Sequence, residues 1–249
     1  MKKYFSLSIF TLLILFISSC KKENPAASGN RTVKVKSYTE TLKSSSGTTS
    51  ETYNFEYDSK DRITAIISAA SPDNKFLFTY HSDTKFTMDL YNGGTVNLHE
   101  DIFLNNSLID STLQYDNTQD TIAEKYVYNS NSLLTFLKEY AYYYGIAILS
   151  RTTAYTYDTN GNLVKTNDTN NKVETYDYYP DLVYTMPVLS PKSNPGKSNL
   201  VKTYTLTENG YDIGSTTSTY TFDSQNRINS ITETATNGSV GTKTFTYFN

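Results

Sequence analysis

The sequence repeats one nine-residue phrase, and this repetition constrains the fold more than any other feature. The clearest copies are FEYDSKDRI at 55–63, YTYDTNGNL at 155–163 and YTFDSQNRI at 220–228. Each copy alternates aromatic and polar residues, then has an aspartate, turn-forming residues and a closing aliphatic residue. Alternation with a period of two is typical of a β-strand with one buried face. Each phrase therefore predicts a strand, a tight turn and the start of the next strand.

The turn residues support this hairpin interpretation. An aspartate side chain accepts hydrogen bonds from the backbone two residues on, and so it starts tight turns. The fourth turn position holds Asp61, Gly161 and Asn226 in the three copies. These residue types tolerate the left-handed backbone region, and a type I turn followed by such a residue gives a short hairpin loop with a bulge. We expect all three residues to have positive φ.

The spacing of the copies predicts the architecture. Weaker copies begin at residues 78 and 126, and a shortened copy begins at Tyr176. The intervals between the starts are 23, 48, 29, 21 and 44 residues, and two of them are near double a basic period of about 22–24 residues, as in a repeat of one supersecondary unit. Tyrosine is abundant, with 23 residues, and threonine and serine are dense, which favours strands. The sequence therefore predicts an all-β fold with almost no helix, an antiparallel meander of β-hairpins that forms a curved sheet or a barrel.

The N-terminus has the pattern of a secretory signal peptide over residues 1–19. Lys2 and Lys3 precede an apolar run at 4–17, and small residues lead to Cys20. A basic start, an apolar stretch and a small-residue cleavage site define such signals, and this run is shorter than the roughly 18–20 residues of a membrane-spanning helix. Cys20 is the only cysteine, so no intramolecular disulfide can form.

The segment Ile17-Ser-Ser-Cys20 resembles the lipobox of bacterial lipoproteins. This resemblance implies that Cys20 is diacylated, becomes the mature N-terminus and anchors the protein to a membrane. Residues 20–31 are polar, include Pro25 and Gly29, and read as a flexible tether, which leaves 32–249 as a single domain. The run at 21–23 resembles export signals of surface lipoproteins in Bacteroides-type bacteria. We therefore expect an outer-membrane lipoprotein on the periplasmic face or the cell surface.

The repeated phrase also resembles a known family pattern. An aromatic-x-Tyr-Asp phrase followed by Gly, Asn or Asp is similar to the YD repeats of Rhs-type proteins. Combined with a lipobox, it resembles a Bacteroides-type family of envelope lipoproteins, a domain of unknown function with a porin-like fold. The resemblance covers most of residues 31–249. It implies a barrel-like fold and supplies no catalytic residues.

Charge and motif content disfavour several function classes. The net charge is −3, and loss of Lys2 and Lys3 with the signal peptide changes it to −5, with no basic run after residue 22. Nucleic-acid binding is therefore not expected. No glycine-rich phosphate loop is present. His81 occupies the position of the turn aspartates Asp58, Asp158 and Asp223 and is predicted to be a turn residue, whereas His99 lacks convincing metal-ligand spacing. We predict no catalytic residues, cofactor or metal, and hence no enzyme.

The aromatic segment 176–184 gives the candidate binding residues Tyr176, Tyr178, Tyr179 and Tyr184. Tyrosine combines a flat apolar ring with a hydroxyl, which suits sugars and amphiphiles. The proline-rich segment 186–199 is either a simple connection or a lid over a concave face. We therefore expect a non-catalytic protein that binds a glycan, lipid or peptide on an aromatic concave β surface. The alternative is a structural or protein-interaction scaffold of the envelope without a pocket.

The alternation leaves two barrel types open. If the aromatic residues faced lipid, the opposite polar face would line the pore of a membrane-spanning barrel. If they faced inward, the barrel would be a soluble body held by its anchor. The acyl anchor makes a spanning barrel redundant and the strands carry many charges, so we expect the anchored body.

Overall fold

The computed structural model describes residues 34–116, 121–185 and 197–248. These residues form antiparallel strands joined by turns and contain no helix, which confirms the all-β prediction. The sixteen strands are β1 (Val35–Ser44), β2 (Gly47–Tyr57), β3 (Ile63–Ser68), β4 (Lys75–Ser82), β5 (Lys85–Asn92), β6 (Thr95–Asn105), β7 (Leu108–Asp116), β8 (Thr121–Tyr128), β9 (Leu134–Tyr143), β10 (Ile146–Tyr157), β11 (Leu163–Asp168), β12 (Lys172–Thr185), β13 (Lys197–Glu208), β14 (Tyr211–Phe222), β15 (Ile228–Ala235) and β16 (Val240–Tyr247).

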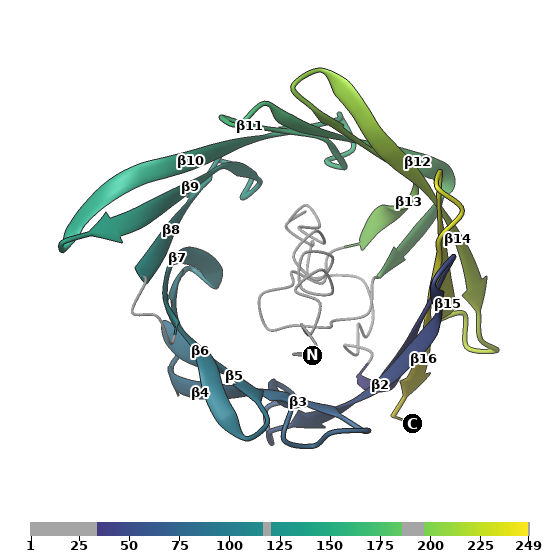
Figure 1. Ribbon diagram of the computed structural model, residues 1–249, viewed down its shortest axis with the longest axis horizontal. Helices are drawn as coiled ribbons and strands as arrows, with labels where there is room; N and C mark the ends of the chain where they lie inside the picture. Colours follow the sequence, from purple (N-terminus) through teal and green to yellow (C-terminus); the bar gives the residue numbers. More distant parts are fainter. Residues whose placement is uncertain (1–33, 117–120, 186–196, 249) are drawn as a thin grey trace.

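The strands form one closed barrel in which each strand pairs with its neighbours in sequence (Figure 1). The ring is closed by antiparallel pairing of β1 with β16, in a register that places Tyr38 opposite Phe245 and Glu40 opposite Lys243. Closure leaves no free sheet edge in the ring, which removes the usual site of edge-to-edge aggregation. The sequence left a curved sheet and a barrel open, and the structure shows the barrel.

The two ends of the barrel differ in their turns. The end that holds Lys34 and Phe248, here called the proximal end, also holds the turns at 58–62, 158–162 and 223–227. The three clear copies of the repeated phrase therefore all turn at the same end of the barrel. The fourth turn residues have φ values of 62° for Asp61, 84° for Gly161 and 61° for Asn226, as predicted.

Each of these turns is held by its first side chain. Asp58 Oδ1 accepts hydrogen bonds from the backbone amides of Lys60 and Arg62, both at 2.9 Å. The Arg62 backbone and guanidinium hydrogen bonds hold the pKa of Asp58 below its usual range. Asp158 and Asp223 make the same pair of backbone contacts in their own turns. The aspartate of the repeated phrase is therefore explained by turn geometry.

A second repeated contact joins strand pairs near the proximal end. In six strand pairs, a tyrosine hydroxyl on the later strand donates a hydrogen bond to a backbone carbonyl on the preceding strand. These six tyrosines are Tyr57, Tyr80, Tyr128, Tyr178, Tyr220 and Tyr247. Burial raises the pKa of Tyr57 and of Tyr80 to about 12, so these hydroxyls stay protonated donors at neutral pH. Tyr157 also lies at the end of its strand, but its buried hydroxyl has no hydrogen-bond partner among the described residues.

We expect Tyr220→Phe to lower the free energy of unfolding by about 1 kcal/mol, because it leaves the Val201 carbonyl without its 2.9 Å partner. Urea unfolding followed by far-UV circular dichroism measures the change. Tyr211→Phe is the matched control, since Tyr211 is 75% exposed and should show no change. Equal losses in both variants would contradict a stabilising role for this hydrogen bond.

Two sequence assignments differ from the structure. Residues 197–199, predicted to belong to the proline-rich loop, are the start of β13, and the rest of that loop lies outside the described residues. His81, which aligns with the turn aspartates, is the penultimate residue of β4, because this hairpin turns two residues later, at 83–84. No helix that could cross a membrane is found in the described part of the chain.

Candidate functional site: the inner wall of the barrel

The barrel encloses a space between walls that stay apart. Among the described residues, only strands adjacent in the ring bring Cα atoms within 8 Å of each other. A closed ring of sixteen strands is wide enough to leave an interior that its own side chains do not fill. The inner wall is thus the candidate binding surface.

Strand pairing shows which side chains share the inner wall. Tyr38 on β1, Phe55 on β2 and Phe245 on β16 are buried. The centroid of the Tyr38 ring lies 6.0 Å from that of Phe55 and 6.2 Å from that of Phe245. They belong to an apolar cluster on one side of the barrel that also includes Ile66 and Ile231. The aromatic face of the alternating strands therefore points inward, as predicted for the anchored type of barrel.

A polar cluster lies on the wall formed by β11, β12 and β13. Glu174, only 5% exposed, accepts hydrogen bonds from Thr166 at 3.0 Å, Tyr176 at 2.9 Å and Tyr204 at 3.2 Å. The Lys172 ammonium lies 3.0 Å from the same carboxylate. Burial raises the pKa of Glu174, but the Lys172 charge and the hydroxyl donors outweigh it, so the net pKa is lowered. Glu174 is therefore a charged carboxylate inside the barrel at neutral pH.

The wall formed by β7 and β8 repeats this arrangement. Glu124 accepts hydrogen bonds from Tyr126 at 2.6 Å and from Thr112 at 3.2 Å. In both places a glutamate bonds the tyrosine two residues on and a threonine on the preceding strand. Burial, followed by the charge of Glu124, raises the pKa of Tyr126 well above its usual value. The repeat pairs an aromatic ring with a carboxylate on one inward-facing surface.

A third inward-facing charge group lies beside the apolar cluster. The Lys243 ammonium is 3.7 Å from Glu40 and 3.8 Å from Glu233, and its side chain is only 6% exposed. Burial raises the pKa of Glu40, the Glu233 charge adds to this shift and Lys243 opposes it. A single buried ammonium therefore lies between two carboxylates here and attracts both of them.

Carboxylates dominate the charge of the inner wall. In the described strands, the glutamates on the inward-facing side are Glu40, Glu51, Glu100, Glu124, Glu139, Glu174, Glu208 and Glu233. Arg151, Lys172 and Lys243 form ion pairs with members of this set. An acidic surface attracts cationic partners and repels anionic ones, and the interleaved tyrosine rings add flat apolar contact that a neutral partner can use.

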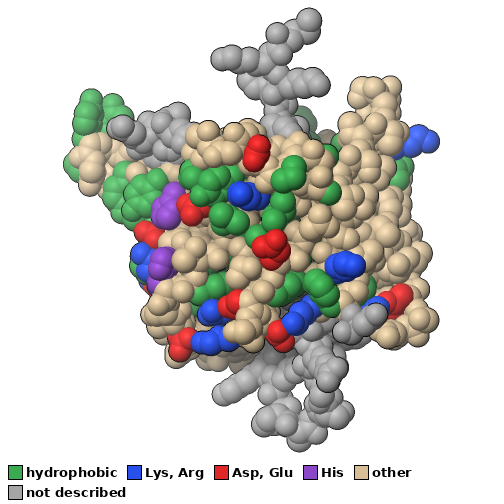
Figure 2. All heavy atoms as spheres, turned by 90° about the horizontal axis from the view of Figure 1, so that it is seen from below, with side chains coloured by type: hydrophobic (Ala, Val, Ile, Leu, Met, Phe, Trp, Pro, Cys, Tyr) green, Lys and Arg blue, Asp and Glu red, His purple; other side chains and the backbone are tan. Residues whose placement is uncertain are grey.

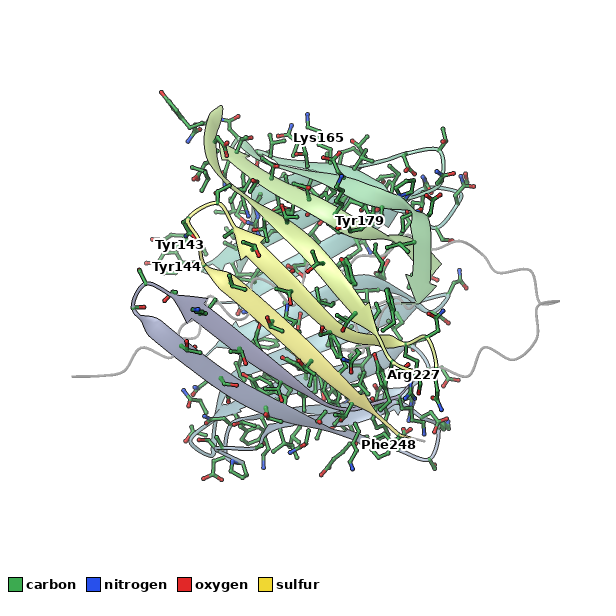
Figure 3. All side chains as sticks on the ribbon, turned by 90° about the vertical axis from the view of Figure 1, so that its right-hand side faces the viewer. Tyr143, Tyr144, Lys165, Tyr179, Arg227 and Phe248 are labelled. Atoms are coloured by element: carbon green, nitrogen blue, oxygen red, sulfur yellow. The ribbon has the colours of Figure 1, made fainter. Side chains whose placement is uncertain are left out.

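The four tyrosines predicted to bind a ligand do not form one site among the described residues. Tyr176 is buried and donates to Glu174 on the inner wall, while Tyr178 donates to the Leu163 carbonyl near the proximal end. Tyr179 packs against the apolar cluster and donates to the Ser218 carbonyl at 3.0 Å; Figure 3 labels it. The side chain of Tyr184 lies outside the described residues. The glutamates were not predicted, although the recurring Glu-x-Tyr spacing at 51–53, 124–126 and 174–176 is visible in the sequence.

The outer wall is polar or mixed. On β1 and β2 it carries rows of hydroxyl side chains, such as Thr39 bonded to Thr52 at 2.8 Å. On β5 and β6 it carries His99, 2.6 Å from Asp89, and Lys85, 2.8 Å from Asp101. Figure 2 shows charged and histidine side chains distributed over one side of the barrel among hydrophobic ones. A lipid-facing barrel needs a continuous apolar band about 25 Å tall, and the described outer faces of β1, β2, β5 and β6 do not provide one.

The possible metal ligands do not gather. Within the ranges that the structure describes, no group of three or more His, Cys, Asp or Glu side chains is placed to hold a metal ion. His81 and His99 lie on neighbouring parts of the outer wall but bond different partners, Thr87 and Asp89. The carboxylate of Asp158, in a turn that superficially resembles a calcium loop, bonds the backbone and side chain of Asn162.

Comparison with solved structures places this fold among porin-like proteins. A porin-like protein from Bacteroides uniformis ATCC 8492 superposes with a TM-score of 0.63 at 15% identity, covering 87% of this chain and 98% of the other. A porin-like protein from Bacteroides vulgatus ATCC 8482 gives a TM-score of 0.63 at 13% identity, covering 87% and 99%. No protein-family model and no curated protein matches the chain. The likeness confirms the expected porin-like fold.

Proposed function

We propose that this chain is a non-catalytic lipoprotein of the bacterial cell envelope that binds a neutral or cationic glycan or peptide inside its barrel. The observation that carries this proposal is the inner wall, where tyrosines and glutamates such as Tyr176 and Glu174 share one surface. Tyrosine rings offer flat apolar contact and carboxylates accept hydrogen bonds from sugar hydroxyls or peptide amines. The acidic charge disfavours anionic lipids among the predicted ligands.

The anchored state is the better match to the outer wall. Hydroxyl rows and ion pairs such as Lys85–Asp101 on the outside suit water, and exposed charges at mid-membrane depth are costly. The likeness to porin-like proteins supports an envelope location. We therefore propose that Cys20 carries the lipid and that the barrel stands outside the bilayer.

Isothermal titration with two peptides of equal length, one lysine-rich and one glutamate-rich, tests the binding proposal. We expect the lysine-rich peptide to bind about tenfold more tightly at low salt, with the difference shrinking as salt screens the wall. Glu124→Gln should weaken that binding several-fold. Glu56→Gln, on the exposed outer face of β2, is the control and should not. Tighter binding of the glutamate-rich peptide would contradict the proposal. Titration of the same protein with neutral oligosaccharides tests whether the ligand is a glycan.

A scaffold without a ligand is the second candidate, and the apolar cluster around Tyr38 and Phe245 favours it, because packed rings need no ligand to be satisfied. If neither peptide nor oligosaccharide binds, and Glu124→Gln changes nothing, the scaffold is the better account.

A further inference from the structure

The hairpin of β9 and β10 extends beyond the barrel wall. β9 pairs with β8 only as far as Ala141, and β10 pairs with β11 only from Thr153. Among the described residues, the strand segment 146–151 pairs with β9 alone. Figure 1 shows this hairpin leaving the ring and projecting outward. Its tip, at Tyr144 and Gly145, lies at the end of the barrel opposite Phe248, here called the distal end (Figure 3).

The projecting hairpin is apolar over ten consecutive residues. The sequence of 140–149 is YAYYYGIAIL, which contains no Asp, Glu, Lys, Arg or His. Tyr144 is 91% exposed, Ile146 67% and Tyr143 66%. Ile148 and Leu149 are also exposed. An exposed apolar segment of this kind marks an interaction surface rather than ordinary solvent contact.

Both faces of the ribbon are apolar. On one face Tyr143 lies opposite Ile146, and Ala141 opposite Ile148. On the other face the cross-strand pairs are Tyr142 with Ala147 and Tyr140 with Leu149. A folded protein surface covers one face of such a ribbon, whereas a fluid apolar medium covers both.

The turn at the tip places a tyrosine, Tyr144, in a backbone conformation that bulky residues disfavour. Tyr144 has φ 49° and Gly145 has φ 78°, nearly the same as Asn209 at 51° and Gly210 at 80° in the β13–β14 turn. Asn-Gly is the favoured pair for such a turn, and a bulky residue at positive φ is strained. A tyrosine at this position therefore points to a role outside the fold.

We propose that the β9–β10 hairpin inserts shallowly into the interfacial region of a lipid bilayer. Tyrosine rings favour the membrane–water interface, where one end is apolar and the other is wet. The segment 146–151 has an open strand edge, since pairing with the neighbouring segment begins at Thr152, whose carbonyl accepts a hydrogen bond from the Thr169 amide. Unpaired backbone groups do not enter the hydrocarbon core. Insertion by about 5–10 Å, the depth typical of interfacial elements, keeps that edge among head groups and water.

The chain preceding the barrel is long enough for this contact. Residues 20–33 connect the predicted acylated cysteine to Lys34 at the proximal end, and an extended stretch of this length reaches about 45 Å. Strands of this length at the usual barrel tilt give a height of about 25–35 Å. The anchor and the hairpin can therefore contact one bilayer with the barrel lying along it. Only this reach argument rests on the proposed anchor; the hairpin's affinity for lipid does not.

Vesicle flotation with the chain that begins at Lys21 tests the hairpin without the anchor. This chain retains every strand of the closed ring, which residues 34–248 complete, and circular dichroism checks that it is folded. The vesicles contain phosphatidylethanolamine and phosphatidylglycerol. The test variant combines Tyr143→Thr, Tyr144→Asn and Ile146→Thr, which restores an Asn-Gly turn and strand-favouring residues, so the hairpin itself is retained.

We expect the test variant to bind vesicles at least about tenfold more weakly than the unsubstituted chain. Tyr211→Thr is the matched control: Tyr211 is an exposed tyrosine beside another distal turn, but Glu208 and Asp212 flank it, and its loss should change binding less than about twofold. Absence of vesicle binding by the unsubstituted chain, or equal binding by the test variant, would overturn the proposal. So would a hairpin-dependent dimer in light scattering without vesicle binding, which would identify a second copy as the occupant.

Discussion

Cys20→Ser is expected to move the protein almost entirely from the membrane fraction to the soluble fraction. Two or three acyl chains on the predicted mature N-terminus give stable anchoring, and without them only weak, reversible contact with a bilayer remains. Cell fractionation with an alkaline wash measures the shift, and metabolic labelling with palmitate reports the acylation directly.

Ser19→Ala is the matched control for this experiment, because it keeps a small residue before Cys20 and should leave both labelling and membrane attachment unchanged. A Cys20→Ser protein that stays in the washed membrane, or an unsubstituted protein that takes up no label, would show that Cys20 is not an acylation site. Because the hairpin test uses a chain without residues 1–20, failure of the anchor would leave that test intact.

Lys243→Met is expected to lower the free energy of unfolding by about 3 kcal/mol at pH 7. The substitution leaves Glu40 and Glu233 close together on the inner wall without the ammonium that lies 3.7 and 3.8 Å from them. Removing one partner of a buried ion pair is strongly destabilising, because an uncompensated charge stays buried. Chemical unfolding at several pH values measures the effect.

The destabilisation should shrink as the pH falls. The folded barrel raises the pKa of Glu40, chiefly by burial, so its folded state favours the protonated form. A carboxyl with a raised folded-state pKa contributes stability that is present at low pH and is lost as the pH rises through that pKa. Loss of Lys243 raises the pKa further, and we expect the variant to recover between pH 7 and the ordinary glutamate pKa of about 4.3.

Lys165→Met is the control for this pair, since Lys165 is exposed on β11 (Figure 3) and its removal should cost less than about 0.5 kcal/mol at any pH. A loss for Lys243→Met that stays constant with pH would indicate that the aliphatic stem, rather than the charge, stabilises the barrel.

Local geometry was predictable because it depends on few residues. The positive φ of Asp61, Gly161 and Asn226 follows from the turn chemistry of each phrase, and the inward aromatic face follows from period-two alternation. Closure was not predictable in the same way. The pairing of Glu40 with Lys243 joins residues two hundred positions apart, and no local pattern states which strand edges meet.

The candidate site was only partly predictable for a related reason. Tyr176 was chosen for its aromatic neighbours, and the structure shows that its inward position is shared with Glu174. Prediction from aromatic density favoured clustered tyrosines such as Tyr178 and Tyr179, which the fold uses for hydrogen bonds to backbone carbonyls. Inward-facing glutamates were overlooked because charged residues in strands are usually assigned to the solvent side.

The seam between β1 and β16 has a consequence for how the protein matures. The first strand can find its last partner only after the C-terminal strand has been synthesised, and the Phe248 amide then donates to the Lys34 carbonyl at 3.1 Å beside this seam. Until then β1 presents an unpaired edge, a template for association with other chains. Such long-range pairing is also slow. Nascent chains should thus depend on a holding chaperone, and C-terminal truncations should aggregate rather than yield smaller barrels.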